Sequence, residues 1–183
     1  MNRMIGLTIL LLGTAVAHAL PLAQAKQARA VIVVGEEPTP AEKTAAAELA
    51  KYLKQITGAD FRIGPGGGDE GLARVLVGPS QAARTVLGSA LVDELGPEEF
   101  IVRTVGNDLL LVGGRPRGTL YAVYSFLDHD LGCRWTTWYG DESIPHRPTL
   151  TVPALNRREA PAMAVRDIVT HPNRNSDPKL LQR

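Results

Sequence analysis

Apolar runs typical of β-strands alternate with runs at helical spacing between residues 30 and 155. The segment "AVIVVG" (30–35) is continuous and β-branched, which predicts a strand buried on both faces. A helix is expected next, because Thr39 can cap it, Pro40 suits its first position and Glu42 completes a capping box. Gly58 predicts the end of this helix.

The rest of the pattern predicts further strands and two more helices. The strands are expected at 61–64, 73–78, 99–106, 108–114 and 149–155, with a hairpin turn at Gly106-Asn107. A short helix begins at Ser80, and a longer apolar one covers 120–131. Residues 89–98 fit a turn or a helix. This order predicts an α+β fold, in which helices pack on a mixed β-sheet.

Composition and charge exclude several classes of function. The chain has 183 residues and a formal net charge of +1, which gives no general attraction to nucleic acid. Its histidines lack the spacing of metal ligands, so we expect no metal and no cofactor. Its single cysteine, Cys133, cannot form an internal disulfide and is expected to be buried and unreactive.

The N-terminus has the pattern of a secretory signal peptide. "MNRM" supplies a positive end, and "IGLTILLLGTAVAHAL" supplies a short apolar stretch. Two small-x-small sites follow, so cleavage is expected after Ala19 or Ala25, and residues 1–25 are assigned to the signal peptide. An uncleaved anchor helix is the alternative. Cleavage predicts a secreted or periplasmic protein with no membrane association.

The turn "GGRPRG" (113–118) lies between a strand and a helix and has two interpretations. Free N–H groups at the helix start, together with Arg115 and Arg117, could bind an anion. The turn nevertheless lacks the lysine and hydroxyl of a P-loop and the spacing of a dinucleotide fingerprint. We therefore expect the glycines to bend the backbone and the arginines to face water. Under this interpretation Leu127→Asp unfolds the domain and Arg117→Ala has little effect.

Catalytic residues are not expected in this chain. Asp128 and Asp130 are two positions apart on a helix and point in different directions, so they cannot serve as a facing pair. Trp135, Trp138 and Tyr139 form a local aromatic cluster. Such rings can stack on a sugar, or they can close a core or a domain interface.

Several segments, taken in order, resemble one family of accessory domains. They are "AEKTAAAELAKYLKQITG", "ARVLVG", "EEFIVRTVGNDLLLVGGRPRGTLYAVYSFLDHDLGCRW", "IPHRPTLTVPAL" and "APAMAVRD". The chain resembles the N-terminal domain of α-glucuronidases and family 20 β-N-acetylhexosaminidases, as found in secreted bacterial proteins before a (β/α)8 barrel. The resemblance implies a zincin-like fold without a metal centre. It also implies an accessory domain at 26–155, with a linker and the start of a truncated catalytic barrel at 156–183.

In such proteins the chemistry belongs to the barrel. The resemblance makes Arg166, in "PAMAVRD", a candidate sugar-binding residue, although the glycine typical after this arginine is Asp167 here. The leading hypothesis is a non-catalytic domain of an exported glycoside hydrolase, whose partner is the missing barrel and which exposes an apolar surface to it. The alternative is a free-standing exported carbohydrate-binding module that uses Trp135, Trp138 and Tyr139.

Overall fold

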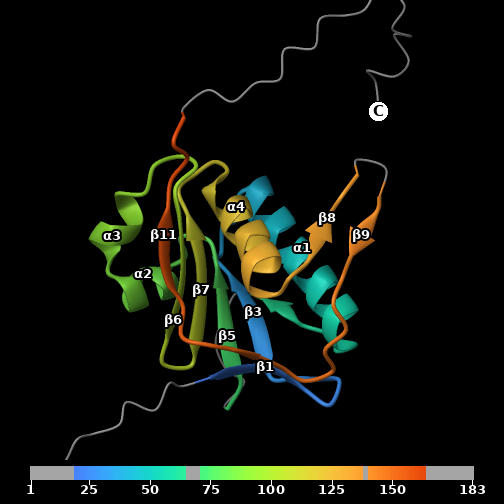
Figure 1. Cartoon of the computed structure of the whole chain (residues 1–183). Helices are drawn as coiled ribbons and strands as arrows, with labels where there is room; N and C mark the ends of the chain where they lie inside the picture. The colour runs from blue at the N-terminus through green and yellow to red at the C-terminus, as the bar shows by residue number, and fades with distance from the viewer. Residues whose placement is uncertain (1–18, 65–70, 138–139, 164–183) are drawn as a thin grey trace, which may run out of the picture.

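The computed structural model describes residues 19–64, 71–137 and 140–163. Among these residues, six strands form a mixed sheet in the order β11-β6-β7-β5-β3-β4 (Figure 1). The strands are β3 (Ala30–Val34), β4 (Ile63–Gly64), β5 (Ala73–Val77), β6 (Phe100–Val105), β7 (Asp108–Gly113) and β11 (Asn156–Glu159). With helices on the sheet, this mixed architecture is consistent with the predicted α+β class. The finer assignment to a zincin-like type stays a prediction.

The centre of the sheet is parallel and apolar. β3 pairs in parallel with β5, and β5 pairs in parallel with β7. All six residues of β7 are buried, including the charged Asp108, whose carboxylate pairs with Arg74 of β5. The hairpin of β6 and β7 pairs Val105 with Asp108 around the predicted turn.

Helix α1 (Pro40–Thr57) begins and ends where the sequence predicts. The Thr39 hydroxyl accepts a hydrogen bond from the Glu42 N–H, and the Glu42 carboxylate accepts one from the Thr39 N–H, at 3.3 and 2.9 Å. These two bonds form the capping box. Gly58 follows in the left-handed conformation, with φ 75°.

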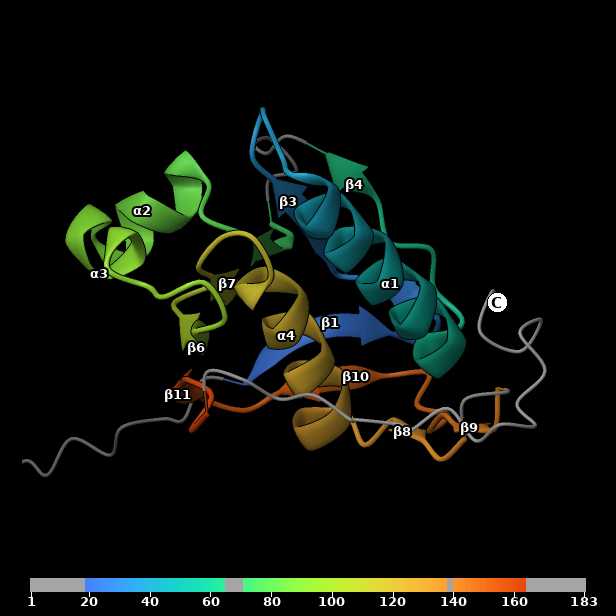
Figure 2. The same cartoon turned by 90° about the horizontal axis from the view of Figure 1, so that it is seen from above.

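Helices cover both faces of the sheet (Figure 2). α1 and α4 (Gly118–Ser125) lie on one face, over the larger apolar core, and α4 continues into the π-helix η1 (Phe126–Asp130). α2 (Gln81–Leu87) and α3 (Ser89–Asp93) lie on the other face, where Ala83 and Val92 pack on the smaller core. The segment that fitted a turn or a helix therefore contains helix α3.

A second sheet, in the order β10-β1-β2, adds to the larger core. Its strands are β1 (Leu20–Gln24), β2 (Gln27–Ala28) and β10 (Leu150–Val152). β1 is the middle strand and pairs antiparallel with both neighbours. The expected domain start at residue 26 is therefore too late, because β1 belongs to the fold.

The expected domain end at residue 155 is too early. The sequence predicts one last strand at 149–155, but only Leu150–Val152 form a strand there, β10. The chain then forms a further strand, β11, which pairs antiparallel with β6. The sheet thus continues to Glu159. A short hairpin of β8 (Arg134–Trp135) and β9 (Glu142–Ser143) extends beside α1 (Figure 1). No helix in the described part of the chain is long and apolar enough to cross a bilayer.

Candidate functional site

The glycines of the 113–118 turn allow two stretches of backbone to touch. A Cβ on Gly114 would overlap the carbonyl oxygen of Gly96 and lie 2.6 Å from that of Leu95. A Cβ on Gly118 would overlap the carbonyl of Glu99. The turn therefore packs directly on the loop at 95–99, and a side chain at either glycine would force the two segments apart.

The N–H groups at the start of α4 are used within the protein. Gly114 donates to the carbonyl of Glu99 at 2.9 Å, and Gly118 donates to that of Pro97 at 3.0 Å. The Arg117 N–H also donates to Pro97, at 3.3 Å. These three N–H groups, which could otherwise bind an anion, are thus engaged by the loop at 95–99. The structure favours the interpretation of the turn as a bend that fixes the helix.

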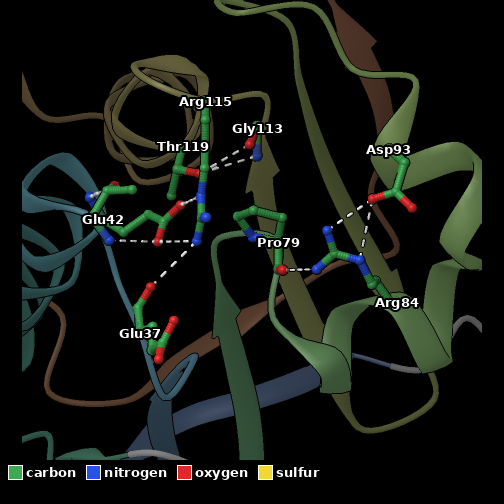
Figure 3. Close-up of polar contacts among 9 residues, drawn as sticks. Glu37, Glu42, Pro79, Arg84, Asp93, Gly113, Arg115 and Thr119 are labelled. Carbon is green, nitrogen blue, oxygen red and sulfur yellow. Dashed lines mark hydrogen bonds and ion pairs between the residues drawn. The ribbon is translucent and has the colours of Figure 1, made fainter.

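Arg115 makes an internal ion pair (Figure 3). Its Nε donates to one carboxylate oxygen of Glu42 at 2.8 Å, and an Nη donates to the other at 3.2 Å. The Glu42 side chain is 5% exposed and that of Arg115 is 54% exposed. The hydrogen bonds to Glu42 raise the pKa of the Arg115 guanidinium. The capping role of Glu42 is predicted by the sequence, but this pair is not, because no local pattern links positions so far apart in the chain.

A polar cleft of about 480 Å³ opens beside this pair, at the carboxyl ends of β3 and β5. α1 and α2 leave these two strands toward opposite faces of the sheet, and clefts at such a reversal are common ligand sites in α/β proteins. Glu36 and Glu37 also line the cleft, so carboxylates outnumber the single lining arginine. This balance disfavours an anionic ligand.

Polar groups on the far side of the cleft are engaged in local structure. The Ser80 hydroxyl caps α2 by accepting from the Ala83 N–H at 3.2 Å. Arg84 donates to the Pro79 carbonyl and pairs with Asp93, the latter at 2.8 Å (Figure 3). The cleft is thus a candidate site by position, but many of its polar side chains stabilise the elements that carry them.

Trp135 packs between two helices. Its ring lies 5.3 Å from that of Tyr52 on α1 and 5.2 Å from that of Tyr124 on α4, both in edge-to-face geometry. Its Nε1–H donates to the Tyr52 hydroxyl at 2.8 Å, and that hydroxyl donates to Glu142 on β9 at 2.8 Å. Burial, with the nearby Glu48 charge, raises the pKa of Tyr124 to about 12. These contacts attach the β8–β9 hairpin to both helices.

The structure does not place the other sugar-binding candidates relative to Trp135. These candidates, Trp138, Tyr139 and Arg166, lie outside the described residues. Their proposed contacts with a sugar stay predictions. The half-buried Trp135 already contacts two tyrosine rings, which limits the ring surface available to a sugar.

Asp128 and Asp130 have different arginine partners. Asp130 binds Arg157 of β11 through two hydrogen bonds, of 2.8 and 2.7 Å, and Asp128 pairs with Arg134 of β8. The two carboxylates serve separate structural contacts, in agreement with the expectation that they do not form a facing pair. Among residues 19–64, 71–137 and 140–163, no group of three histidine, cysteine or acidic side chains could hold a metal ion.

Cys133 is fully buried, as expected, and burial raises the pKa of its thiol. The expected apolar docking surface stays a prediction for the part of the chain that the structure describes. The large exposed hydrophobic side chains there are Ile63, Val105 and Met163, which lie on β4, at the end of β6 and after β11. They are scattered because the sheet faces are already covered by helices.

Over residues 16–126 the chain matches the family model described as the glycosyl hydrolase family 67 N-terminus. The chain therefore belongs to this family of glycoside hydrolase N-terminal domains. The match bears out the α-glucuronidase side of the predicted resemblance. The likeness to family 20 β-N-acetylhexosaminidases stays a prediction.

A solved structure has a similar fold. It is described as a family GH115 4-O-methyl-α-glucuronidase with specificity for decorated arabinogalactans, and it shares 17% sequence identity with this chain at a TM-score of 0.59. The alignment covers 78% of this chain and 18% of that chain, so the present chain spans less than a fifth of its length. At this identity the likeness shows the fold alone. A comparison with curated proteins finds no match.

Proposed function

We propose that this chain is the exported, non-catalytic N-terminal domain of a carbohydrate-active hydrolase, and that it supports a (β/α)8 barrel that follows it. The carrying observation is the use of the 113–118 turn, whose donors and glycines hold α4 against the loop at 95–99. The turn that could have bound an anion is thus used for packing, as the sequence predicts. Family membership supports the position of the domain at the N-terminus of a hydrolase.

Ion pairs support the non-catalytic role. Glycosidic cleavage uses two facing carboxyl groups, roughly 5 to 10 Å apart, one of which must hold a proton. In the described residues, many carboxylates instead pair with an arginine. These pairs are Glu42–Arg115, Glu98–Arg117, Glu99–Arg158, Asp108–Arg74, Asp128–Arg134 and Asp130–Arg157. A carboxylate bound in this way is poorly placed to protonate a leaving group.

The whole protein would act on α-linked uronic acids. The family 67 match favours this substrate class over N-acetylhexosamines, and the GH115 enzyme of similar fold is itself an α-glucuronidase by its description. The linker to the barrel would begin after Glu159, where β11 ends. Arg166 would then belong to the first barrel strand, as the sequence resemblance implies.

The test compares two products of the same gene. The DNA is read through to its stop codon, and the present chain and any longer product are purified and assayed on aryl α-glucuronides, aryl N-acetyl-β-glucosaminides and aldouronic acids. The present chain should show no turnover, and a longer product should release glucuronic acid. Turnover by the present chain alone contradicts the proposal. Retardation of the present chain on a glycan-containing gel, lost in a Trp138→Ala variant, would favour a carbohydrate-binding module instead.

A further inference from the structure

The strand β1 determines where a signal peptide can be removed without damage to the fold. Leu20, Leu22 and Ala23 are 1%, 0% and 0% exposed and belong to the larger core. The strand pairs with β10, beside which it lies in Figure 2, and on its other side with β2. Loss of β1 would open this core and leave the hydrogen-bonding groups of both neighbours unpaired.

The two small-x-small sites lie at opposite ends of this strand. A cut after Ala25 removes β1 completely, whereas a cut after Ala19 leaves it intact. Ala19 is exposed, so the loss of its side chain removes nothing from the core. The family model begins at residue 16, so the part of the chain common to the family includes β1.

The second site is also part of the folded hairpin. Ala25 and Lys26 form the turn between β1 and β2, with φ 50° and 64°. The Ala25 N–H donates to the Thr149 hydroxyl at 3.1 Å, and the Lys26 N–H donates to the Pro148 carbonyl at 2.8 Å. These bonds attach the turn to the segment before β10, as expected of a position that the mature domain retains.

We propose that the signal peptidase cuts between Ala19 and Leu20, and that the mature chain begins "LPLAQAKQ". The peptidase hydrolyses this one peptide bond with water and releases residues 1–19. This inference rests on the proposed export of the protein. The site after Ala25 matches the sequence pattern equally well, but a cut there would yield a domain without β1, the middle strand of the second sheet.

The first experiment expresses the full chain with a C-terminal tag in a secreting bacterial host and measures the intact mass and N-terminal sequence of the exported product. The expected N-terminus is Leu20. A product that begins at Lys26 overturns the inference but leaves export standing. An exported chain that keeps its first residues overturns the processing but leaves export standing, and a chain that stays in the cytoplasm overturns the proposed export.

One substitution, placed at both sites, is the matched control. Asparagine is too large and polar for the residue before the cut, and it tolerates the left-handed conformation found at Ala25. Ala19→Asn should stop formation of the mature product, and Ala25→Asn should leave it unchanged. The reverse pattern overturns the inference.

A stability measurement does not depend on export. Chains that begin at Leu20 and at Lys26 are produced without the leader, and their thermal unfolding is compared. The shorter chain should lose its cooperative transition or melt at least about 10 °C lower. Equal melting of the two chains would show that β1 is dispensable and would overturn the inference.

Discussion

Substitution of Gly114 tests whether the glycine-rich turn acts through packing. In Gly114→Ala the new Cβ would lie 2.6 Å from the Leu95 carbonyl oxygen and would overlap that of Gly96. A comfortable carbon–oxygen contact is about 3.4 Å, so the turn and the loop at 95–99 must separate by roughly 0.8 Å or more. The hydrogen bonds from Gly114 to Glu99 and from Gly118 to Pro97 span the same contact.

The magnitude follows from these two effects. Overpacking of this kind costs about 1–3 kcal/mol, and each weakened hydrogen bond adds about 1 kcal/mol. Gly114→Ala should therefore lower the free energy of unfolding by about 3–5 kcal/mol, a large part of the stability of an ordinary domain. Urea denaturation followed by circular dichroism measures this as a lower midpoint with an unchanged slope.

Gly64→Ala is the matched control, because a Cβ at Gly64 meets nothing within 4 Å. This variant should remain within about 0.5 kcal/mol of the parent. If Gly114→Ala unfolds at the parent's urea concentration, the packing argument for the turn is wrong. A Gly114→Ala protein of normal stability that has lost affinity for phosphate would restore the anion-binding interpretation.

Two further predictions concern the core and the pH dependence. Leu127 is fully buried, so Leu127→Asp should abolish the cooperative thermal transition. Arg117→Ala removes an ion pair whose arginine is exposed, and it should move the melting temperature by no more than a few degrees. The opposite ranking would refute the structural interpretation of this stretch. The hydrogen bond from Arg158 holds the pKa of the Glu99 carboxyl below its ordinary 4.5. The unfolded chain therefore binds a proton at Glu99 more readily than the folded chain does. The contribution of this group to stability is present above pH 4.5 and is lost as the pH falls. Glu99→Gln should therefore flatten the pH dependence of the urea midpoint below about pH 5, and an unchanged dependence would show that Glu99 contributes nothing to it.

The amino-acid sequence by itself determined the local elements of this domain. Thr39, Glu42 and Gly58 mark both ends of α1 through short-range bonds, and the apolar run of β3 predicts a strand buried on both faces. The hairpin between β6 and β7 is visible for the same reason, since its turn residues and alternating strands are adjacent in the chain. Such features depend on neighbours within a few positions.

The tertiary structure alone decided the contacts between distant segments. Leu20–Gln24 resembles the end of a leader until β10 is seen to pair with it, and Asn156–Glu159 is too polar to be recognised as a strand before β6 supplies its hydrogen bonds. Glu42 and Arg115 are also far apart in the chain, and only the structure shows that they form an ion pair. From the sequence alone, Arg115 could have bound an anion. Pairing of strands and of charges depends on which surfaces folding brings together, and no periodicity along the chain records it.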